Sequence, residues 1–559
     1  MRCLRVSILA MVVVVWSCGG SGGGSGGSAR PDTLSSRWAA PSILSHVPAD
    51  TPYLVAVLEP INESLRQKML QGIDERFAEA LRTLEATRAD AGDKLDPWIR
   101  ALIAVMKEMR GKTGTNWMEH LGFDPRGRFA LYGLSMWPVM RIEISSATRL
   151  RATIERVMAT AKVKLPQRMF AGHPYWVAGG ENFSFVAAVL EREAVAAVVP
   201  TSLLDAMLPL VLGTRTPEPN LATAPVVPDL LGRHRFLGIL LGYLDARNAI
   251  DIVAGARPGP FDAPIRTATG AVSPACRGDL DRLAALVPRF VFGYHRVDEK
   301  GFEGSAVLET APGVVSALRK LHAMVPEVTA PTAGHPLVAF GAALDPRELV
   351  NWLKGVTGQL QVHPFTCPWF AKLNDAGTEL AGKLATPLPP TWFGLRGFSL
   401  VLDDATVKPP SFAGHLIVAG ERVSDLVTSL AGTVPAIAGI PLNSNGRPIV
   451  LPVQQFQLPV RSAHLALTTD RLVIAAGGDS ARVATEVLAV PAPKVSPLMV
   501  MAFNMPRAQQ LLVAMGQPPV TNVGYIDDVG IGLDVVDAGI AFDVWGTWHL
   551  TPPPATIAH

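Results

Sequence analysis

The sequence predicts an α+β protein with two duplicated halves, each a largely antiparallel sheet with helices packed on it, and a helical insertion in the first half. Two observations lead to this prediction. Apolar strands and helices follow one another in the order strand, turn, strand, helix, which differs from the strand–helix alternation of a doubly wound parallel sheet. The same ordered series of segments also occurs twice along the 559 residues, which is typical of internal duplication.

The chain begins with a segment that is typical of targeting rather than of a fold. A basic start, an apolar run at 6–16 and small Ser17 precede Cys18. This is the pattern of a secretory signal, and the run is too short to span a bilayer as a helix. A cysteine directly after the small residue resembles the lipobox of bacterial lipoproteins, which implies removal of residues 1–17 and acylation of Cys18. The alternative is an ordinary secreted protein that is cut near Ser17 and keeps a free thiol.

A glycine- and serine-rich stretch follows the cysteine and predicts a tether over residues 18–39. Because it has little to bury, we expect a flexible coil that spans roughly 20 Å. Acyl chains on Cys18 would anchor it stably to a membrane. Gly19, and not aspartate, stands directly after the cysteine, and the lipoprotein resemblance then implies the outer membrane.

The two halves, 40–327 and 328–552, each carry the same motif twice, and residues 553–559 form a tail. Each copy is an apolar strand that leads directly into a helix. The four copies are "YLVAVLEPINESL" (53–65), "LGILLGYLDARNAI" (237–250), "LVAFGAALDPRELV" (337–350) and "VMAFNMPRAQQLL" (500–512). The strands are apolar nearly throughout, which predicts that both of their faces are covered.

The junctions of these copies predict helix caps at Pro60, Asp245, Asp345, Pro346 and Pro506. The third copy has the clearest physical basis. Asp345 can accept hydrogen bonds from backbone N–H groups, and Pro346 suits the first helical position. Glu348, three residues after the aspartate, predicts a capping box.

The insertion is expected at residues 63–111 and has no counterpart in the second half. Its apolar residues recur at spacings of three or four, which predicts one stripe along a helix: Leu65, Met69, Ile73, Phe77, Leu81 and Leu84. Asp96 and Pro97 predict the start of a second helix. The insertion is interpreted as a helical hairpin laid over the sheet; the alternative is a mobile lid over an apolar pocket.

Further segments correspond in the same order in the two halves. Residues 141–158 parallel 415–432, each a strand followed by a helix, and 173–177 parallel 447–451. Residues 185–213 parallel 465–489, each two strands and a helix. The segments 291–309 and 529–548 both predict hairpins with a glycine at the turn. Residues 328–336 are the natural join between the halves.

Two cysteines remain once the signal is removed and Cys18 is acylated. Cys276 and Cys367 each stand near the start of a predicted helix, and two thiols in an oxidising compartment predict one disulfide. Closing a loop of about 91 residues would stabilise the fold by roughly 4–5 kcal/mol. The alternative is a pair of buried free thiols.

The sequence predicts no catalytic residue, no metal site and no cofactor. It has no Gly-x-Ser-x-Gly elbow, no His-Glu-x-x-His and no phosphate-binding loop. The carboxylate pairs in "VLDDAT" (401–406) and "YIDDVG" (525–530) follow apolar strands and are interpreted as polar turns, although such pairs can also bind a cation or act as acid and base. A formal charge of +2, with no basic block in the body, argues against nucleic acid as a partner.

The lipobox, the glycine tether and the opening "VPADTPYLVAV" together resemble envelope lipoproteins of high-GC, double-membraned bacteria, myxobacteria among them. The resemblance implies a location but no activity, ligand or functional residue. Three classes of function follow. The first is a non-catalytic, membrane-anchored envelope protein that binds a partner or supports an assembly. The alternatives are a carrier or chaperone for lipid or another apolar ligand, and a hydrolase whose site the sequence does not reveal.

Overall fold

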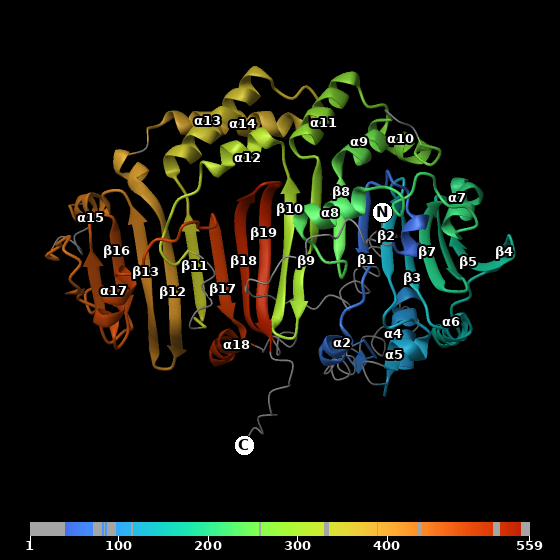
Figure 1. The fold of residues 1–559 in the computed structure, drawn as a ribbon, viewed down its shortest axis with the longest axis horizontal. Helices are drawn as coiled ribbons and strands as arrows, with labels where there is room; N and C mark the ends of the chain where they lie inside the picture. Colours follow the sequence, from blue (N-terminus) through green and yellow to red (C-terminus); the bar gives the residue numbers. More distant parts are fainter. Residues whose placement is uncertain are drawn as a thin grey trace.

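A single antiparallel sheet runs through the whole molecule. The computed structural model describes residues 40–70, 81–82, 84–85, 97–112, 116–255, 259–328, 335–387, 389–432, 439–517 and 526–548. Within them, nineteen strands form one sheet and fifteen α-helices lie around it, as Figure 1 shows. The predicted α+β class, with antiparallel strands and helices packed on them, is therefore confirmed.

The first ten strands make one side of this sheet. They are β1 (Tyr53–Val57), β2 (Phe129–Leu134), β3 (Trp137–Glu143), β4 (Gln167–Phe170), β5 (His173–Gly179), β6 (Phe183–Val189), β7 (Glu193–Pro200), β8 (Leu241–Asp245), β9 (Arg289–Asp298) and β10 (Gly301–Glu309). From the edge inward their order is β4, β5, β6, β7, β3, β2, β1, β8, β9, β10, and every neighbouring pair is antiparallel.

The other nine strands continue the sheet to its second edge. They are β11 (Val338–Ala343), β12 (Leu395–Val407), β13 (Pro410–Gly420), β14 (Ile449–Val450), β15 (Ala463–Leu467), β16 (Arg471–Ala476), β17 (Met499–Asn504), β18 (Ile526–Val536) and β19 (Gly539–Trp548). Outward from the middle their order is β19, β18, β17, β11, β12, β13, β16, β15, β14. The two sides meet where β10 pairs with β19, and we call this junction the seam.

Helices lie at the strand ends and on the faces of the sheet. In the first part of the chain they are η1 (Ser42–His46), α2 (Glu63–Leu70), α4 (Pro97–Met109), α5 (Asn116–Leu121), α6 (Ala147–Ala161), η3 (Thr201–Leu203), α7 (Leu204–Val211), α8 (Val226–His234), α9 (Ala246–Ala254), α10 (Ala263–Thr269) and α11 (Pro274–Leu286). Those that follow are α12 (Pro312–Arg319), α13 (Pro346–Val362), η4 (Pro368–Phe370), α14 (Ala371–Ala385), η5 (Pro390–Gly394), α15 (Val423–Ala431), α17 (Ser480–Leu488) and α18 (Met505–Ala514). Figure 1 shows α11, α12, α13 and α14 gathered at one end of the central strands, and α2, α5 and α18 at the other.

The main core lies on one face of the sheet, which we call the covered face. Successive strands contribute fully buried side chains to it, such as Leu54 on β1, Val139 on β3 and Val291 on β9. Residues of η1, α7 and α8 pack against them. In the second part of the chain, α17 covers the same face of β15 and β16 through Ala484 and Val487.

Four strand–helix junctions were predicted, and the strands and helices are present at all four. Asp245 and Asp345 are N-caps, and their carboxylates accept hydrogen bonds from backbone N–H groups in the first turns of α9 and α13. Pro346 is the first residue of α13, as expected. The predicted capping box is incomplete, because the N–H of Asp345 donates to the carbonyl of Leu321 at 2.8 Å. The sheet also pairs the four strands, β1 with β8 and β11 with β17.

The other two junctions are capped by different residues from those predicted. Pro60 lies in an exposed loop before α2, and the carboxamide of Asn62 accepts from the N–H of Ser64 there. Pro506 lies inside α18, whose N-cap is Asn504. A rigid proline fits the first turn of a helix, but an N-cap requires a side-chain oxygen.

Two further expectations need correction. The carboxylate pairs at 403–404 and 527–528 are not turns, because both lie in long strands at β-bulges, where the register of β12 and β18 shifts by one residue. The helical insertion at 63–111 was predicted to have no counterpart later in the chain. Two helices, α13 and α14, however, also connect β11 to β12. Of the predicted stripe, Leu65 and Leu81 are buried, whereas Ile73 and Phe77 lie outside the described residues.

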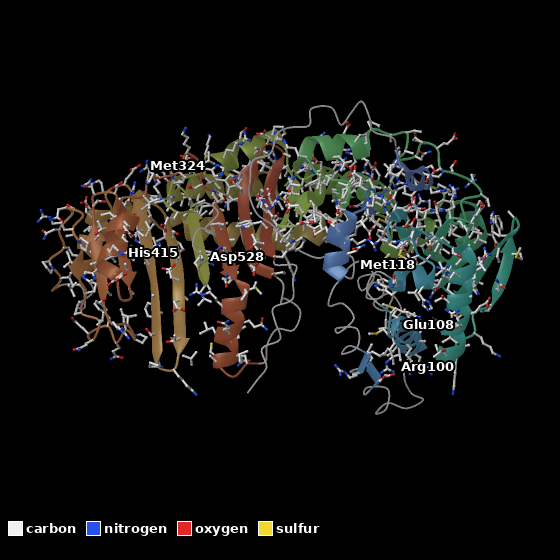
Figure 2. All side chains as sticks on the ribbon, turned by 60° about the horizontal axis from the view of Figure 1, so that its bottom comes forward. Arg100, Glu108, Met118, Met324, His415 and Asp528 are labelled. Carbon is white, nitrogen blue, oxygen red and sulfur yellow. A yellow bond between two sulfur atoms is a disulfide. The ribbon has the colours of Figure 1, made fainter. Side chains whose placement is uncertain are left out.

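The end of the insertion packs on the rest of the first part of the chain. Arg100 on α4 donates to the carbonyl of Ala161 at the end of α6, and Glu108 pairs with Arg156 on α6 at 3.0 Å (Figure 2). Ile103 and Met106 of the same helix form a small cluster with Leu81. No helix among the described residues is long and apolar enough to cross a membrane.

Candidate functional site

The second face of the sheet, which we call the open face, carries an unbroken row of apolar residues. Because paired residues of antiparallel strands point to the same side, the register identifies the row. It crosses thirteen strands through Met140, Leu131, Val55, Gly242, Phe292, Ala306, Phe542, Leu533, Met499, Ala342, Phe398, Val418 and Leu472. Each residue is directly paired with the next. At 4.7–4.9 Å per strand, the row is about 58 Å long.

Large side chains of the open face are exposed to solvent. Phe542 is 47 % and Phe398 37 % exposed within the row. A flanking row includes Ile531 and Leu400, each 46 % exposed, and on β8 Leu244 is 47 % exposed. The strands are therefore not covered on both faces as predicted.

The open face is covered near the two edges of the sheet. Val418 and Leu472 pack in a cluster with Val423 of α15, and Ala187 of β6 packs in a cluster with Leu150 of α6. The uncovered part of the row therefore runs over the eleven strands from Met140 to Phe398.

The open face is covered near both ends of its central strands, which leaves a band between them. At one end Val315 and Leu318 of α12 pack with Val535 and partly buried Ile540. At the other end the rings of Phe302 and Trp548 stack at 6.0 Å, and both side chains are buried. On β19 the uncovered band therefore comprises Phe542 and Val544, which is two side-chain repeats, or about 14 Å.

An apolar band of this size is unusual on a protein surface. From Met140 to Phe398 the uncovered band is about 48 Å by 14 Å, or roughly 670 Å², whereas the largest apolar patch of a typical monomer is about 300–600 Å². The row contains no charged or hydrogen-bonding side chain, and the backbone groups of its strands bond to neighbouring strands. The band can therefore hold an apolar surface by burial alone.

A polar cluster lies on the covered face at the seam. His295 Nε2 is 2.8 Å from Ser305 Oγ, and its Nδ1 is 3.4 Å from the carbonyl of Arg235. Burial lowers the pKa of His295, so the ring is neutral near pH 7 and can accept the serine proton. This contact is the nearest approach to a nucleophile–base pair at the seam. Ser305 is buried, however, and its strand is hydrogen-bonded on both sides, so its backbone N–H groups cannot stabilise an oxyanion. The pair therefore has a structural role.

Three carboxylates adjoin this pair. Asp543 lies directly opposite Ser305, and burial, with Asp534 and Glu303 nearby, raises the pKa of Asp543 to about 6. His322 pairs with Asp534 at 2.6 Å, and Arg296 pairs with Glu303 at 3.4 Å. In the described part of the chain, no group of three or more histidine, cysteine or acidic side chains is placed to hold a metal ion.

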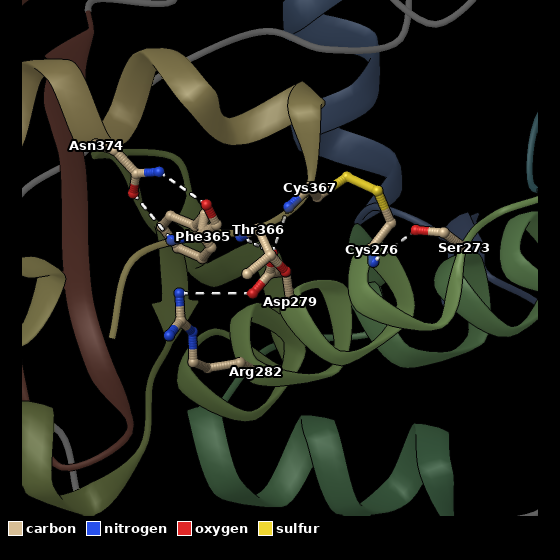
Figure 3. The surroundings of a disulfide bond; sticks show 8 residues. All are labelled: Ser273, Cys276, Asp279, Arg282, Phe365, Thr366, Cys367 and Asn374. Carbon is tan, nitrogen blue, oxygen red and sulfur yellow. Dashed lines mark hydrogen bonds and ion pairs between the residues drawn. A yellow bond between two sulfur atoms is a disulfide. The ribbon is translucent and has the colours of Figure 1, made fainter. Parts of the chain in front are cut away.

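The two predicted disulfide cysteines are bonded, and the bond joins the two sides of the molecule. Cys276 lies in α11, before the seam, and Cys367 precedes η4, beyond it; their Cα atoms are 4.3 Å apart (Figure 3). Asp279 accepts hydrogen bonds from the N–H groups of Thr366 and Cys367 at 2.7 and 2.8 Å. Arg282 lies over the ring of Phe365 at 4.1 Å. The Arg-Gly-Asp sequence at 277–279 therefore lies within α11, and its aspartate holds the backbone next to Cys367.

The bulged carboxylates also have structural partners. Asp528 accepts from the amide of Asn504 at 3.0 Å and from Thr547 at 3.1 Å, and it pairs with His335 at 2.7 Å. Figure 2 locates Asp528 and His415 among the strands of the second part of the chain. The bulge therefore holds the start of α18 against β18.

Among the residues singled out in the sequence, Cys18 lies outside the described residues. The helix caps and the disulfide stabilise the fold, and none of them lies on the open face. The open-face residues were missed because each strand alone reads as an ordinary buried strand. Comparison with known protein families, with curated proteins and with solved structures gives no match for this chain.

Proposed function

We propose that this protein is a non-catalytic, lipid-anchored protein of the bacterial envelope that binds an apolar ligand on the open face of its sheet. The observation that carries the proposal is the unbroken apolar row that stays uncovered across eleven strands, in which Phe542 is 47 % and Phe398 37 % exposed. Burying such side chains is favourable by about 25 cal/mol per Å² of apolar area. A ligand that covers the band therefore gains affinity without any polar contact.

The test is the binding of an apolar dye, such as Nile red, to the purified protein. We expect fluorescence enhancement with wild type. Ile531→Asp should bind the dye with at least a tenfold higher Kd, because the dye would have to desolvate a carboxylate on the open face. Val450→Asp is the matched control, since Val450 is 68 % exposed on edge strand β14 and lies outside the row. Equal dye binding by the two variants would contradict the proposed site.

The location depends on Cys18 and the tether that follows it. The lipobox resemblance and the glycine-rich stretch support an anchor in the outer membrane. Cells that carry Cys18→Ser should release the protein into the soluble fraction, and wild type should sediment with membranes. Membrane sedimentation of both proteins in the same amounts would refute the anchor.

We also infer that the two halves arose by duplication, with a pseudo-twofold axis at the seam. The two hairpin glycines, Gly301 and Gly539, are 238 positions apart, and so are Ser305 and Asp543, which pair with each other. Gly301 pairs with Thr547, and Glu309 with Gly539, so the register is symmetric about this pair. The strand order outward from the seam also corresponds, if β4 and β5 together match β14. Superposition of the halves should align these strands, and failure of the corresponding strands to superpose would refute the inference.

A further inference from the structure

The band on the open face has the shape of a linear hydrocarbon ligand. Between Met140 and Phe398 it is about 48 Å long across the strands and about 14 Å wide along them. One long side is closed by α12 on Val535 and Ile540, and the other by the stacked rings of Phe302 and Trp548. We infer that the ligand is a membrane phospholipid whose acyl chains lie across the strands, along the row and over the seam. This inference rests on the proposed function.

The side chains of the row on the open face favour acyl chains over a peptide as the ligand. An extended peptide on the band would have to satisfy its own backbone N–H and C=O groups, and the row offers no partner for them. A hydrocarbon chain has no such groups. The phenyl ring of Phe292 lies over Gly242, where a Cβ would come within 2.1 Å of the ring, so the row stays continuous even at the glycine.

The length of the band fits more than one chain. The hydrocarbon core of a bilayer is about 30 Å thick and two chains deep, so each chain occupies about 15 Å. The uncovered part of the row is therefore about three chain lengths long and can hold both chains of a phospholipid. Because Ala306 and Phe542 face each other across the seam, a chain at the centre contacts both halves of the molecule. We expect one shared site rather than one site in each half.

The predicted tether brings the band close to a source of phospholipid. Twenty-two residues, 18–39, separate the acylated cysteine from the first described residue, Ala40. Fully extended, they reach about 75 Å, so the sheet stays within that distance of the bilayer surface. Phospholipid is then the most abundant linear apolar molecule within reach.

The experiment uses the full-length mature protein and vesicles of phosphatidylethanolamine and phosphatidylglycerol that contain a trace of phospholipid with a pyrene-labelled acyl chain. We expect the wild type to extract the labelled lipid and Phe542→Asp to extract it at least tenfold less. Val450→Asp, in the same anchored chain, should match wild type. Shortening the acyl chains should strengthen extraction about twofold for each methylene removed, since each methylene is fully buried in the bilayer and only about half covered on the open face.

Each other outcome overturns the inference in a distinguishable way. If Nile red binds but no phospholipid is extracted, the ligand class is wrong and the proposed function stands. If neither binds, both fail. If Phe542→Asp extracts as much lipid as wild type, the lipid binds elsewhere. If the wild type is a dimer by sedimentation that Phe542→Asp dissociates, and no lipid is extracted, a second copy of the chain covers the face.

Discussion

Replacement of Asp543 by asparagine should stabilise the protein, and the gain should depend on pH. Asp543 stands at the seam opposite Ser305, and its carboxylate is partly buried next to two other acids, Asp534 and Glu303. Burial and these two charges raise its pKa to about 6, from 3.8 in the unfolded chain. The ionised form is therefore disfavoured in the folded state. Asparagine keeps the shape and removes the charge, and its amide can donate to the neighbouring carboxylates.

The magnitude follows from linkage between proton binding and folding. Since the folded-state pKa lies above the unfolded one, wild type loses stability as pH rises from about 3.8 to 6 and stays at the lower level above that range. This difference in pKa lowers the free energy of unfolding of wild type by about 3 kcal/mol at pH 8 and by about 0.6 kcal/mol at pH 4. With an unfolding entropy of about 2.1 cal/mol/K per residue over about 500 residues, Asp543→Asn should raise Tm by about 3 °C at pH 8 and by less than 1 °C at pH 4.

The assay is thermal unfolding of wild type and variant at both pH values, followed by circular dichroism. Asp537→Asn in the turn of the same hairpin is the control, because its side chain is almost fully exposed and exposed ion pairs contribute little. It should shift Tm by under 0.5 °C at either pH. A gain from Asp543→Asn that is equal at pH 8 and pH 4 would refute the electrostatic origin, and no gain at pH 8 would refute the burial of a charged group at the seam.

Four further substitutions test the packing of the sheet and its helices. Arg141→Met should lower the free energy of unfolding, measured in urea, by about 3–5 kcal/mol. Arg141 is fully buried, and its loss leaves Glu193 without the partner that lies 2.6 Å away. A much smaller loss of stability would mean that the site repacks. Cys276→Ser should lower stability by about 4–5 kcal/mol, and Cys367→Ser on top of it should add under 1 kcal/mol; additive losses would contradict a shared disulfide. Asn504→Ala should lower the free energy of unfolding by about 2–4 kcal/mol, because it removes both the N-cap of α18 and the hydrogen bond to buried Asp528; a change below 0.3 kcal/mol in urea unfolding would argue against both contacts.

Much of the local structure follows from short-range signals in the sequence. The junctions at Asp245 and Asp345 could be predicted because an aspartate oxygen, a first-turn N–H and the preceding apolar strand all lie within a few residues of each other. The hairpins that end in Gly301 and Gly539 are also local features. The pairing of Cys276 with Cys367 was predictable only because no other cysteine remains in the body.

Features that depend on distant contacts were missed. The bulges at 403–404 and 527–528 looked like turns, since two acids in a row usually end a strand. They continue as strands because hydrogen-bond and ion-pair partners, such as buried Asn504 and exposed His335 beside Asp528, compensate the carboxylate. The helices α13 and α14 were likewise not recognised as counterparts of the segment at 63–111, because the two share a place in the topology and no sequence pattern.

The most informative failure concerns the coverage of the strands. Apolar residues at successive positions of β8, β11 and β17 predicted burial on both faces, yet the open face leaves Leu244 and, beside these strands, Ile531 and Phe398 exposed. Strands of a sheet with one solvent-facing side usually alternate apolar and polar residues, and this alternation does not destabilise the sheet. If solvent were the only neighbour of the open face, some of these positions would therefore carry polar residues. Here the register gives eleven consecutive uncovered residues, from Met140 to Phe398, without one polar side chain. An uncovered surface with the composition of a core is expected when a second apolar body completes that core, and the band between α12 and the Phe302–Trp548 stack is where that body would bind.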